Sequence, residues 1–284
     1  MPELITSIAG LRDRLAGPRQ HLKRIGLVPT MGALHAGHAS LIEAAMRDCD
    51  LVVVSIFVNP IQFNNPDDYA KYARNLQTDL DLCGTYSVHV VFAPTVDEMY
   101  PTPQETIVDV PEVSKGLCGE FRPGHFRGVA TVVTKLFNIV QPGIAYFGEK
   151  DAQQLAVIRT MVRDLNMPLS IRGLPTVREP DGLAMSSRNE RLSPVERPLA
   201  RVLYKALQAA KASLEDGVRD VNAIRQTGLT VLAGQPEVRL EYLEVVDAIT
   251  MRALAEISGS VCVAIAAWVG SVRLIDNVFW PQKP

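Results

Sequence analysis

The chain alternates between short apolar runs and longer segments in which apolar residues recur every three or four positions. Apolar runs predict β-strands, and the recurring pattern predicts amphipathic helices. We expect strands at Ile25–Val28, Leu51–Val58, Val88–Ala93, Ile144–Phe147 and Leu169–Arg172. We expect helices at Gly37–Arg47, Asp67–Leu82, Phe126–Ile139 and Ala152–Leu165. This alternation is typical of β-α units and predicts a Rossmann-like parallel sheet with helices on both faces.

Polar segments directly follow three of the predicted strands. They are the turn at Pro29–His38, the segment Asn59–Gln62 and the segment Gly148–Asp151. In an open parallel sheet, ligands bind outside the carboxyl ends of the strands. We therefore expect these three segments to meet at one edge of the sheet.

The pattern changes after about Thr176. A polar loop at Val177–Asn189 is followed by predicted helices at Pro194–Glu215 and Val221–Leu232, and by predicted strands at Leu240–Val246 and Val261–Val269. We predict a Rossmann-like domain over residues 1–176 and a smaller α+β lid domain over residues 177–284.

The composition is that of a soluble globular protein. The 284 residues are 47% hydrophobic, and the net charge is −2. This balance gives no overall field to attract nucleic acid or an anionic membrane, so we expect neither partner. The uncharged stretch Ile257–Val272 is too short to cross a bilayer and predicts a buried strand. The N-terminus lacks the pattern of a secretory signal.

The four cysteines show no C-x-x-C spacing. This usage is typical of reduced thiols in a cytoplasmic protein, and we expect neither a disulfide nor a structural zinc.

The turn at Pro29–His38 carries two histidines, His35 and His38, at the start of a predicted helix. Gly32 and Gly37 let the backbone turn tightly. The free N–H groups at a helix N-terminus favour an anion, and imidazoles can donate hydrogen bonds to a phosphate. This position favours phosphate binding. The alternative, a metal site, needs a third ligand.

The familiar phosphate-binding loops are absent. Gly143–Gly148 has the glycine spacing of a P-loop, but Glu149 separates it from Lys150, and no G-x-G-x-x-G follows a strand. The sequence therefore argues against a P-loop kinase and a nicotinamide dehydrogenase.

Other polar segments offer groups for an anion. Lys150 can reach a phosphate, although Gly148–Asp151 can also be a simple capped helix start. Met185–Arg188 supplies two hydroxyls and a guanidinium in a loop that we expect to be mobile, although such a loop is commonly a surface connection. Phe121–Gly128 is either a further anion contact or an ordinary helix start, and Asp79 is a weak candidate for a Mg²⁺ ligand.

Together these segments resemble pantothenate synthetase, the pantoate–β-alanine ligase family, nearly from end to end. The matching segments are P-T-M-G-A-L-H-A-G-H, F-V-N-P-I-Q-F, R-P-G-H-F-R-G-V-A-T-V-V-T-K-L-F, F-G-E-K-D-A-Q-Q-L and M-S-S-R-N. This family belongs to the nucleotidylyltransferases with a His-x-Gly-His turn. M-S-S-R stands in place of the K-M-S-K-S loop of related synthetases, with Arg188 at the second lysine, as is usual in this family.

The resemblance implies that ATP and pantoate form a pantoyl adenylate, which β-alanine converts to pantothenate with release of AMP. It implies Mg²⁺ on the phosphates, with protein ligands unknown, and a homodimer. It places around the phosphates the catalytic residues His35, His38, Lys150, Ser186, Ser187 and Arg188, with His38 as the proton donor. The wider ATP site that it implies comprises Met31, Gly32, Ala33, Leu34, His35, Ala36, Gly37, His38, Gly148, Glu149, Lys150, Asp151, Val177, Met185, Ser186, Ser187 and Arg188. Gln62 and Gln154 match pantoate ligands, with Gln62 also near β-alanine.

Three other functions compete with this one. An adenylyltransferase that acts on a nucleotide or on phosphopantetheine has no need of Gln62 and Gln154 and would not release AMP. A nucleotide sensor would bind ATP without pyrophosphate exchange, and a metal hydrolase would lose zinc to a chelator.

Overall fold

The computed structural model describes residues 1–281, and within them the chain forms two compact units. The first comprises Met1–Pro111, Arg122–Glu149 and Val157–Pro175. The second comprises Glu112–Phe121, Lys150–Ala156 and the stretch from Thr176 onward. The domain limits 1–176 and 177–284 stay a prediction.

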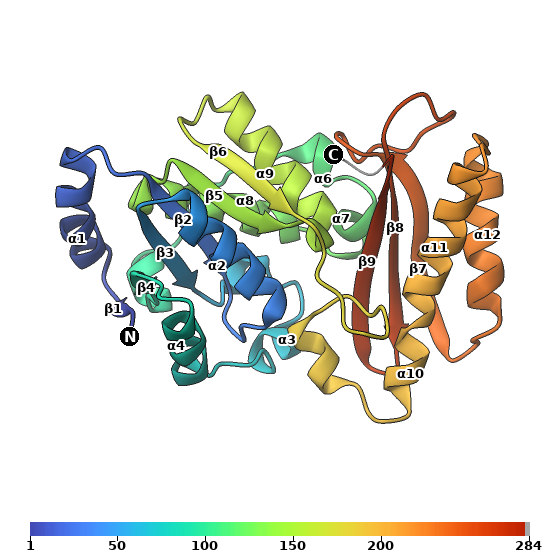
Figure 1. The fold of residues 1–284 in the computed structure, drawn as a ribbon, viewed down its shortest axis with the longest axis horizontal. Helices are drawn as coiled ribbons and strands as arrows, with labels where there is room; N and C mark the ends of the chain where they lie inside the picture. The colour runs from blue at the N-terminus through green and yellow to red at the C-terminus, as the bar shows by residue number, and fades with distance from the viewer. Residues whose placement is uncertain (282–284) are drawn as a thin grey trace. The chain divides into compact units, whose positions relative to one another are not determined.

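The first unit is built on a parallel sheet. Over residues 1–281 this sheet has six strands in the order β1-β4-β3-β2-β5-β6, and every neighbouring pair is parallel (Figure 1). The strands are β1 (Glu3–Ile5), β2 (Ile25–Thr30), β3 (Leu51–Ile56), β4 (Val90–Phe92), β5 (Ile144–Gly148) and β6 (Ser170–Leu174). Five of them match the predicted strands, which confirms the predicted fold class.

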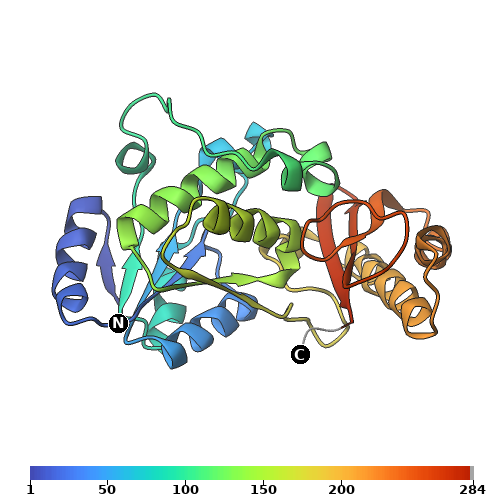
Figure 2. The ribbon, with the colours of Figure 1, turned by 90° about the horizontal axis from the view of Figure 1, so that it is seen from above.

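Helices cover both faces of this sheet. Figure 2 shows α2 (Ala36–Asp48) and α4 (Leu76–Thr85) on one face and α8 (His125–Val140) on the other. The remaining helices before Thr176 are α1 (Ile8–Gln20), η1 (Pro60–Gln62), α3 (Pro66–Ala70), α5 (Val96–Met99), α6 (Pro111–Ser114), α7 (Leu117–Phe121), η2 (Glu149–Asp151) and α9 (Ala152–Asp164).

The core of the first unit lies between α2, α4 and the central strands. Val52 and Val54 of β3, Ile42 of α2 and Tyr146 of β5 are fully buried there. Because β3 is apolar on both faces, it suits a central strand that helices cover on each side.

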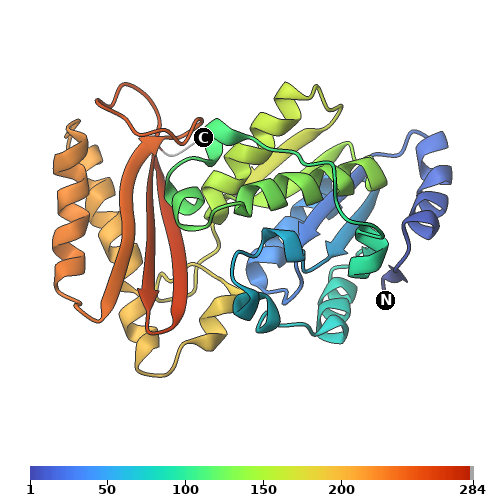
Figure 3. The same ribbon diagram turned by 180° about the vertical axis from the view of Figure 1, so that it is seen from behind.

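The second unit contains an antiparallel sheet, which within the described residues has three strands in the order β7-β8-β9. Its strands are β7 (Val238–Asp247), β8 (Val261–Val269) and β9 (Val272–Trp280), and its helices are η3 (Ser187–Arg191), α10 (Glu196–Ala200), α11 (Val202–Glu215) and α12 (Val221–Ala233). The helices α11 and α12 lie against one face of this sheet (Figure 3). The uncharged stretch Ile257–Val272 contains the buried strand β8, as expected.

The predicted helix Asp67–Leu82 is wrong as a single element, because the structure has two helices there, α3 and α4. Asn75 ends the continuity: its side chain accepts a hydrogen bond from the Thr78 N–H and so begins a new helix. The strands β1 and β9 and the helix α1 were not predicted. Asp276 and Asn277 hid β9, since two polar residues in mid-run lower the strand signal.

None of the helices in the described part of the chain is both long and apolar enough to span a bilayer. The four cysteines, all within residues 1–281, are free thiols.

Candidate active site

The histidine turn joins the end of β2 to the start of α2. His35 is the N-cap of α2, and its Nδ1 accepts a hydrogen bond from the Gly37 N–H at 3.1 Å. His38, one turn into the helix, accepts a hydrogen bond from the His35 N–H on its own Nδ1 at 3.3 Å. The two rings lie 4.2 Å apart, centroid to centroid. The sequence folds this way locally because each imidazole satisfies a backbone donor that the helix start leaves open.

These hydrogen bonds assign the protonation of both rings. A nitrogen that accepts a backbone N–H carries no proton, so in each neutral ring the proton is on Nε2. Both histidines therefore present an Nε2–H donor. A pair of such donors at a helix N-terminus is suited to the oxygens of a phosphate.

Gln62 lies in η1, which follows β3 at the same carboxyl edge of the sheet, and it is only 6% exposed. Its side-chain Oε1 accepts from Asn59 Nδ2 at 3.1 Å. Its backbone carbonyl lies 2.8 Å from His125 Nδ1. A Cβ on Gly128 would come within 2.6 Å of the Gln62 Cα, so α8 needs glycine there to pack against η1. Gln62 is thus held from three sides.

The amide nitrogen of Gln62 has a weak partner. Its Nε2 lies 2.8 Å from the thioether sulfur of Met31, and sulfur is a poor hydrogen-bond acceptor. An oxygen of a bound substrate would be a better acceptor for the same N–H. The geometry therefore leaves Gln62 ready to bind a hydroxyl or a carboxylate.

Asn59 and His125 escaped the sequence reasoning as supports of Gln62. Asn59 is buried, donates to both Gln62 Oε1 and the Gly128 carbonyl, and accepts from the Tyr100 hydroxyl. Both residues lie inside the matching segments, but a segment does not say which side chain contacts a ligand and which one holds a neighbour.

Lys150 and Gln154 belong to the second unit. Lys150 lies in η2, where Asn277 of β9 donates to its backbone carbonyl at 2.8 Å, and its Nζ is 3.8 Å from Asp151. Gln154 is half-buried on α9. The adjacent Gln153 is buried instead, and its amide donates to the carbonyls of Val113, Lys115 and Gly116.

The loop with Met185–Arg188 starts from a short hairpin. Met185 N–H donates to the Val177 carbonyl, which brings these two predicted ATP contacts side by side. Ser186 caps η3, its hydroxyl accepting from the Arg188 N–H at 3.2 Å. Buried Asn189 donates to Glu179 and to the Ala184 carbonyl. The stem of the loop is therefore ordered by its own contacts, and the mobility of Ser187 and Arg188 stays a prediction.

A buried ion pair anchors this hairpin to β9. Arg178 donates to both oxygens of Asp276, at 2.6 and 2.9 Å, and Asp276 is only 4% exposed. The guanidinium also lies 3.9 Å from the ring centroid of Tyr204 on α11. Arg178 thus fixes the start of the segment that leads to Ser186, Ser187 and Arg188.

Each unit groups a part of the predicted site. His35, His38 and Gln62 lie at the carboxyl edge of the first unit's sheet, and Lys150, Gln154, Ser186, Ser187 and Arg188 belong to the second unit. Within residues 1–281, no group of three His, Cys, Asp or Glu side chains is arranged to hold a metal. The histidine pair thus lacks the third ligand that a metal site there would require.

The fold and the histidine turn define a Rossmann-like α/β protein with a ligand-binding turn at the carboxyl edge of its sheet. The sequence profile of the family described as Pantoate-beta-alanine ligase matches residues 3–279. The chain therefore belongs to the pantoate–β-alanine ligase family.

Close relatives cover nearly the whole chain. The pantothenate synthetase of Moorella thermoacetica is 50% identical over 276 residues, 97% of this chain and 98% of that protein. The crystal structure of the pantoate–β-alanine ligase of Thermus thermophilus matches with a TM-score of 0.93 at 46% identity, covering 97% of this chain and 98% of that one. The Francisella tularensis ligase, complexed with β-γ ATP and β-alanine, matches with a TM-score of 0.82 at 33% identity over 100% of both chains.

Proposed function

We propose that this chain joins pantoate to β-alanine to form pantothenate, using ATP and releasing AMP and pyrophosphate. The observation that carries the proposal is the Francisella tularensis relative, which matches over the full length of both chains and was solved with β-γ ATP and β-alanine. The family description supplies the remaining substrate, pantoate.

The reaction has two steps. A carboxylate oxygen of pantoate attacks the α-phosphorus of ATP, and the bond from that phosphorus to pyrophosphate breaks. The amine nitrogen of β-alanine then attacks the carbonyl carbon of the adenylate, the bond to AMP breaks, and the amine loses a proton. Neither step needs a protein nucleophile, so catalysis consists of positioning and of stabilising the charge on the departing pyrophosphate.

The phosphate contacts come from both units in this proposal. His35 and His38 donate from Nε2, Lys150 supplies a point charge, and Ser186, Ser187 and Arg188 complete the set. Their alignment with developing charge favours the transition state over bound ATP. His38 also supplies the proton that the resemblance assigns to it.

Gln62 and Gln154 bind pantoate in this proposal, and neutral amides suit the task. A bidentate arginine would hold the carboxylate strongly in the ground state and would reduce its reactivity as a nucleophile. Amides fix the hydroxyls of pantoate and leave the carboxylate free to attack. The weakly engaged Nε2 of Gln62 supports this role.

Mg²⁺ enters as part of the substrate, bound to ATP. The described residues offer it no ready group of three acidic or histidine ligands, so we expect phosphate oxygens and water to coordinate it.

The function is tested by incubating the protein with ATP, Mg²⁺ and pantoate, with and without β-alanine. Pantothenate and AMP should form in equal amounts only when β-alanine is present. ADP in place of AMP would indicate an acyl-phosphate ligase, and no turnover would favour a nucleotide sensor.

Labelled pyrophosphate should exchange into ATP when pantoate and Mg²⁺ are present and β-alanine is absent. The reason is that the adenylate forms before the amine is needed, and a site that excludes water protects the mixed anhydride between the steps. The exchange is followed by the label recovered in ATP, with pantoate omitted as the control. Exchange that requires β-alanine would contradict the order of the steps.

Gln154→Ala should weaken pantoate far more than ATP. A lost hydrogen bond to a bound hydroxyl costs about 1–3 kcal/mol, which raises the KM for pantoate roughly 5- to 150-fold and leaves the ATP contacts intact. Initial rates at varied concentrations of each substrate provide the measurement. Gln77→Ala, at an exposed position of α4, is the control, and an equal rise in both KM values would argue against a pantoate role.

We also propose a homodimer in the cytoplasm. The family resemblance supports the dimer, and the free thiols suit a reducing compartment. Light scattering of the purified protein tests the assembly.

A further inference from the structure

Asp79 is a buried carboxylate whose contacts are with backbone amides rather than with solvent. It lies on α4 and is 2% exposed. Its Oδ1 accepts from the Leu34 N–H at 2.7 Å, and its Oδ2 accepts from the Ala33 N–H at 3.0 Å. Burial raises the pKa of this carboxyl, and the two amides oppose the rise because they favour the charged form. A carboxylate retained in such a place is expected to have a task.

The two amides belong to a strained turn. Gly32 and Ala33 are consecutive residues with positive φ, +81° and +50°. Alanine rarely adopts this conformation, so an outside contact must hold it. A Cβ on Gly32 would come within 2.8 Å of Asp79 Oδ2, so the turn and the carboxylate are fitted to each other.

The turn leads directly to the catalytic histidines. Leu34 precedes His35, which caps α2 and donates its own N–H to His38. A shift of the Ala33–Leu34 backbone would therefore move both imidazoles together. Misplacement of a catalytic group by about 1 Å can lower a rate by about 10²-fold.

We propose that Asp79 is a positioning residue for adenylate formation: its two oxygens hold the Ala33 and Leu34 amides and thereby set the place of His35 and His38. This rests on the proposed function. It differs from the role of Mg²⁺ ligand, because both oxygens of Asp79 already accept backbone hydrogen bonds.

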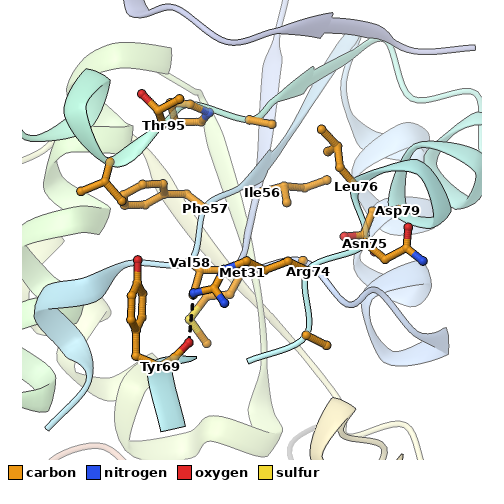
Figure 4. A pocket seen from close by; sticks show the side chains of 15 residues that line it. Met31, Ile56, Phe57, Val58, Tyr69, Arg74, Asn75, Leu76, Asp79 and Thr95 are labelled. Atoms are coloured by element: carbon orange, nitrogen blue, oxygen red, sulfur yellow. Dashed lines mark hydrogen bonds between the residues drawn. The ribbon is translucent and has the colours of Figure 1, made fainter. Parts of the chain in front are cut away.

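A pocket of about 260 Å³ borders the carboxylate, lined by Met31 and Gly32 of the turn, by Asn75, Leu76 and Asp79, and by other residues of the first unit. In Figure 4, Asp79 and Asn75 lie together at the start of α4, on one side of this pocket. Truncation of Asp79 to alanine would enlarge the pocket and confuse lost packing with lost hydrogen bonds. The isosteric change Asp79→Asn avoids this.

In Asp79→Asn the amide has one oxygen and one NH₂ group. Either orientation places the NH₂ against a backbone N–H, so one of the two hydrogen bonds becomes a clash of donors. We expect the kcat of pantoate-dependent pyrophosphate exchange to fall by about 10²-fold, with the KM for pantoate unchanged because Gln62 and Gln154 are untouched. Asp81→Asn, at an exposed position on the same helix, should behave as the wild type.

Hydrogen exchange gives a readout that does not depend on substrate. In Asp79→Asn the amides of residues 31–38 should exchange faster, while strands β3 and β5 stay protected. If the variant fails to fold, Asp79→Asn is repeated with Ala33→Gly, since glycine adopts the positive φ without cost.

A folded Asp79→Asn variant with normal kcat and normal exchange at residues 31–38 would overturn the proposal. So would recovery of its activity at raised Mg²⁺, because that result would identify a metal ligand. If the wild type itself shows no pantoate-dependent exchange, the proposed function fails, whereas the hydrogen-exchange result still decides whether Asp79 orders the turn.

Discussion

His38→Ala is expected to lower the rate of adenylate formation by roughly 10²–10³-fold while the protein remains folded. The change removes a hydrogen-bond donor aimed at the charge that develops on the phosphates, and the loss of one such donor typically has an effect of this size. The measurement is pantoate-dependent pyrophosphate exchange, with folding checked by circular dichroism.

Two further substitutions separate the two roles of His38. Its Nδ1 accepts the His35 N–H and so supports the helix start, whereas Nε2 carries the proposed catalytic proton. Asparagine places its oxygen near the position of Nδ1, and glutamine places its amide nitrogen near the position of Nε2. His38→Gln should therefore retain more activity than His38→Asn.

The matched control is His21→Ala, because His21 is exposed and lies just after α1. It should leave exchange unchanged. Near-normal exchange in folded His38→Ala would contradict the assignment of the histidine turn as the phosphate site.

Arg178→Ala is expected to lower the free energy of unfolding of the second unit by about 3–5 kcal/mol, because it leaves the buried Asp276 carboxylate without its partner. The guanidinium also donates to the carbonyls of Gly182 and Asn277, so the hairpin before Ser186 would lose several contacts at once. A large loss is expected because Asp276 has little access to water.

Urea unfolding followed by tryptophan fluorescence measures this loss. The chain has two tryptophans, Trp268 and Trp280, and both lie on strands of the second unit's sheet. Lys211→Ala is the control, since its ion pair with Glu215 is an i,i+4 pair at the surface of α11 and is worth about 0.3–0.5 kcal/mol. A loss no larger than that of Lys211→Ala would show that the Asp276 carboxylate is not desolvated as the structure indicates.

The sequence pattern was sufficient for the sheet of the first unit. Strands such as β3 are continuous apolar runs, and α2 and α8 have clear helical periodicity, so local information determines both. It was not sufficient for β9, where Asp276 breaks the apolar run. That residue is tolerated in the strand because Arg178, which is 98 positions away in the chain, neutralises it.

The candidate site divides in the same way. The His-x-Gly-His turn, Gln62, Lys150 and the Ser186–Arg188 segment were visible as motifs, because their chemistry depends on residue type and local spacing. The tautomer of the histidines and the supports of Gln62 were not visible, because they depend on which backbone group each nitrogen faces.

By itself, the sequence determined the fold class, the family and the residues that carry the chemistry, since these follow from periodicity and from short motifs. Only the tertiary structure showed that Asp79 holds the histidine turn, that Asn59, His125 and Gly128 hold Gln62, and that Asp276 pairs with Arg178. Each of these contacts joins residues far apart in the chain. A buried polar group is stable only beside a partner of matching chemistry, and which residue becomes that partner is decided when the elements pack together.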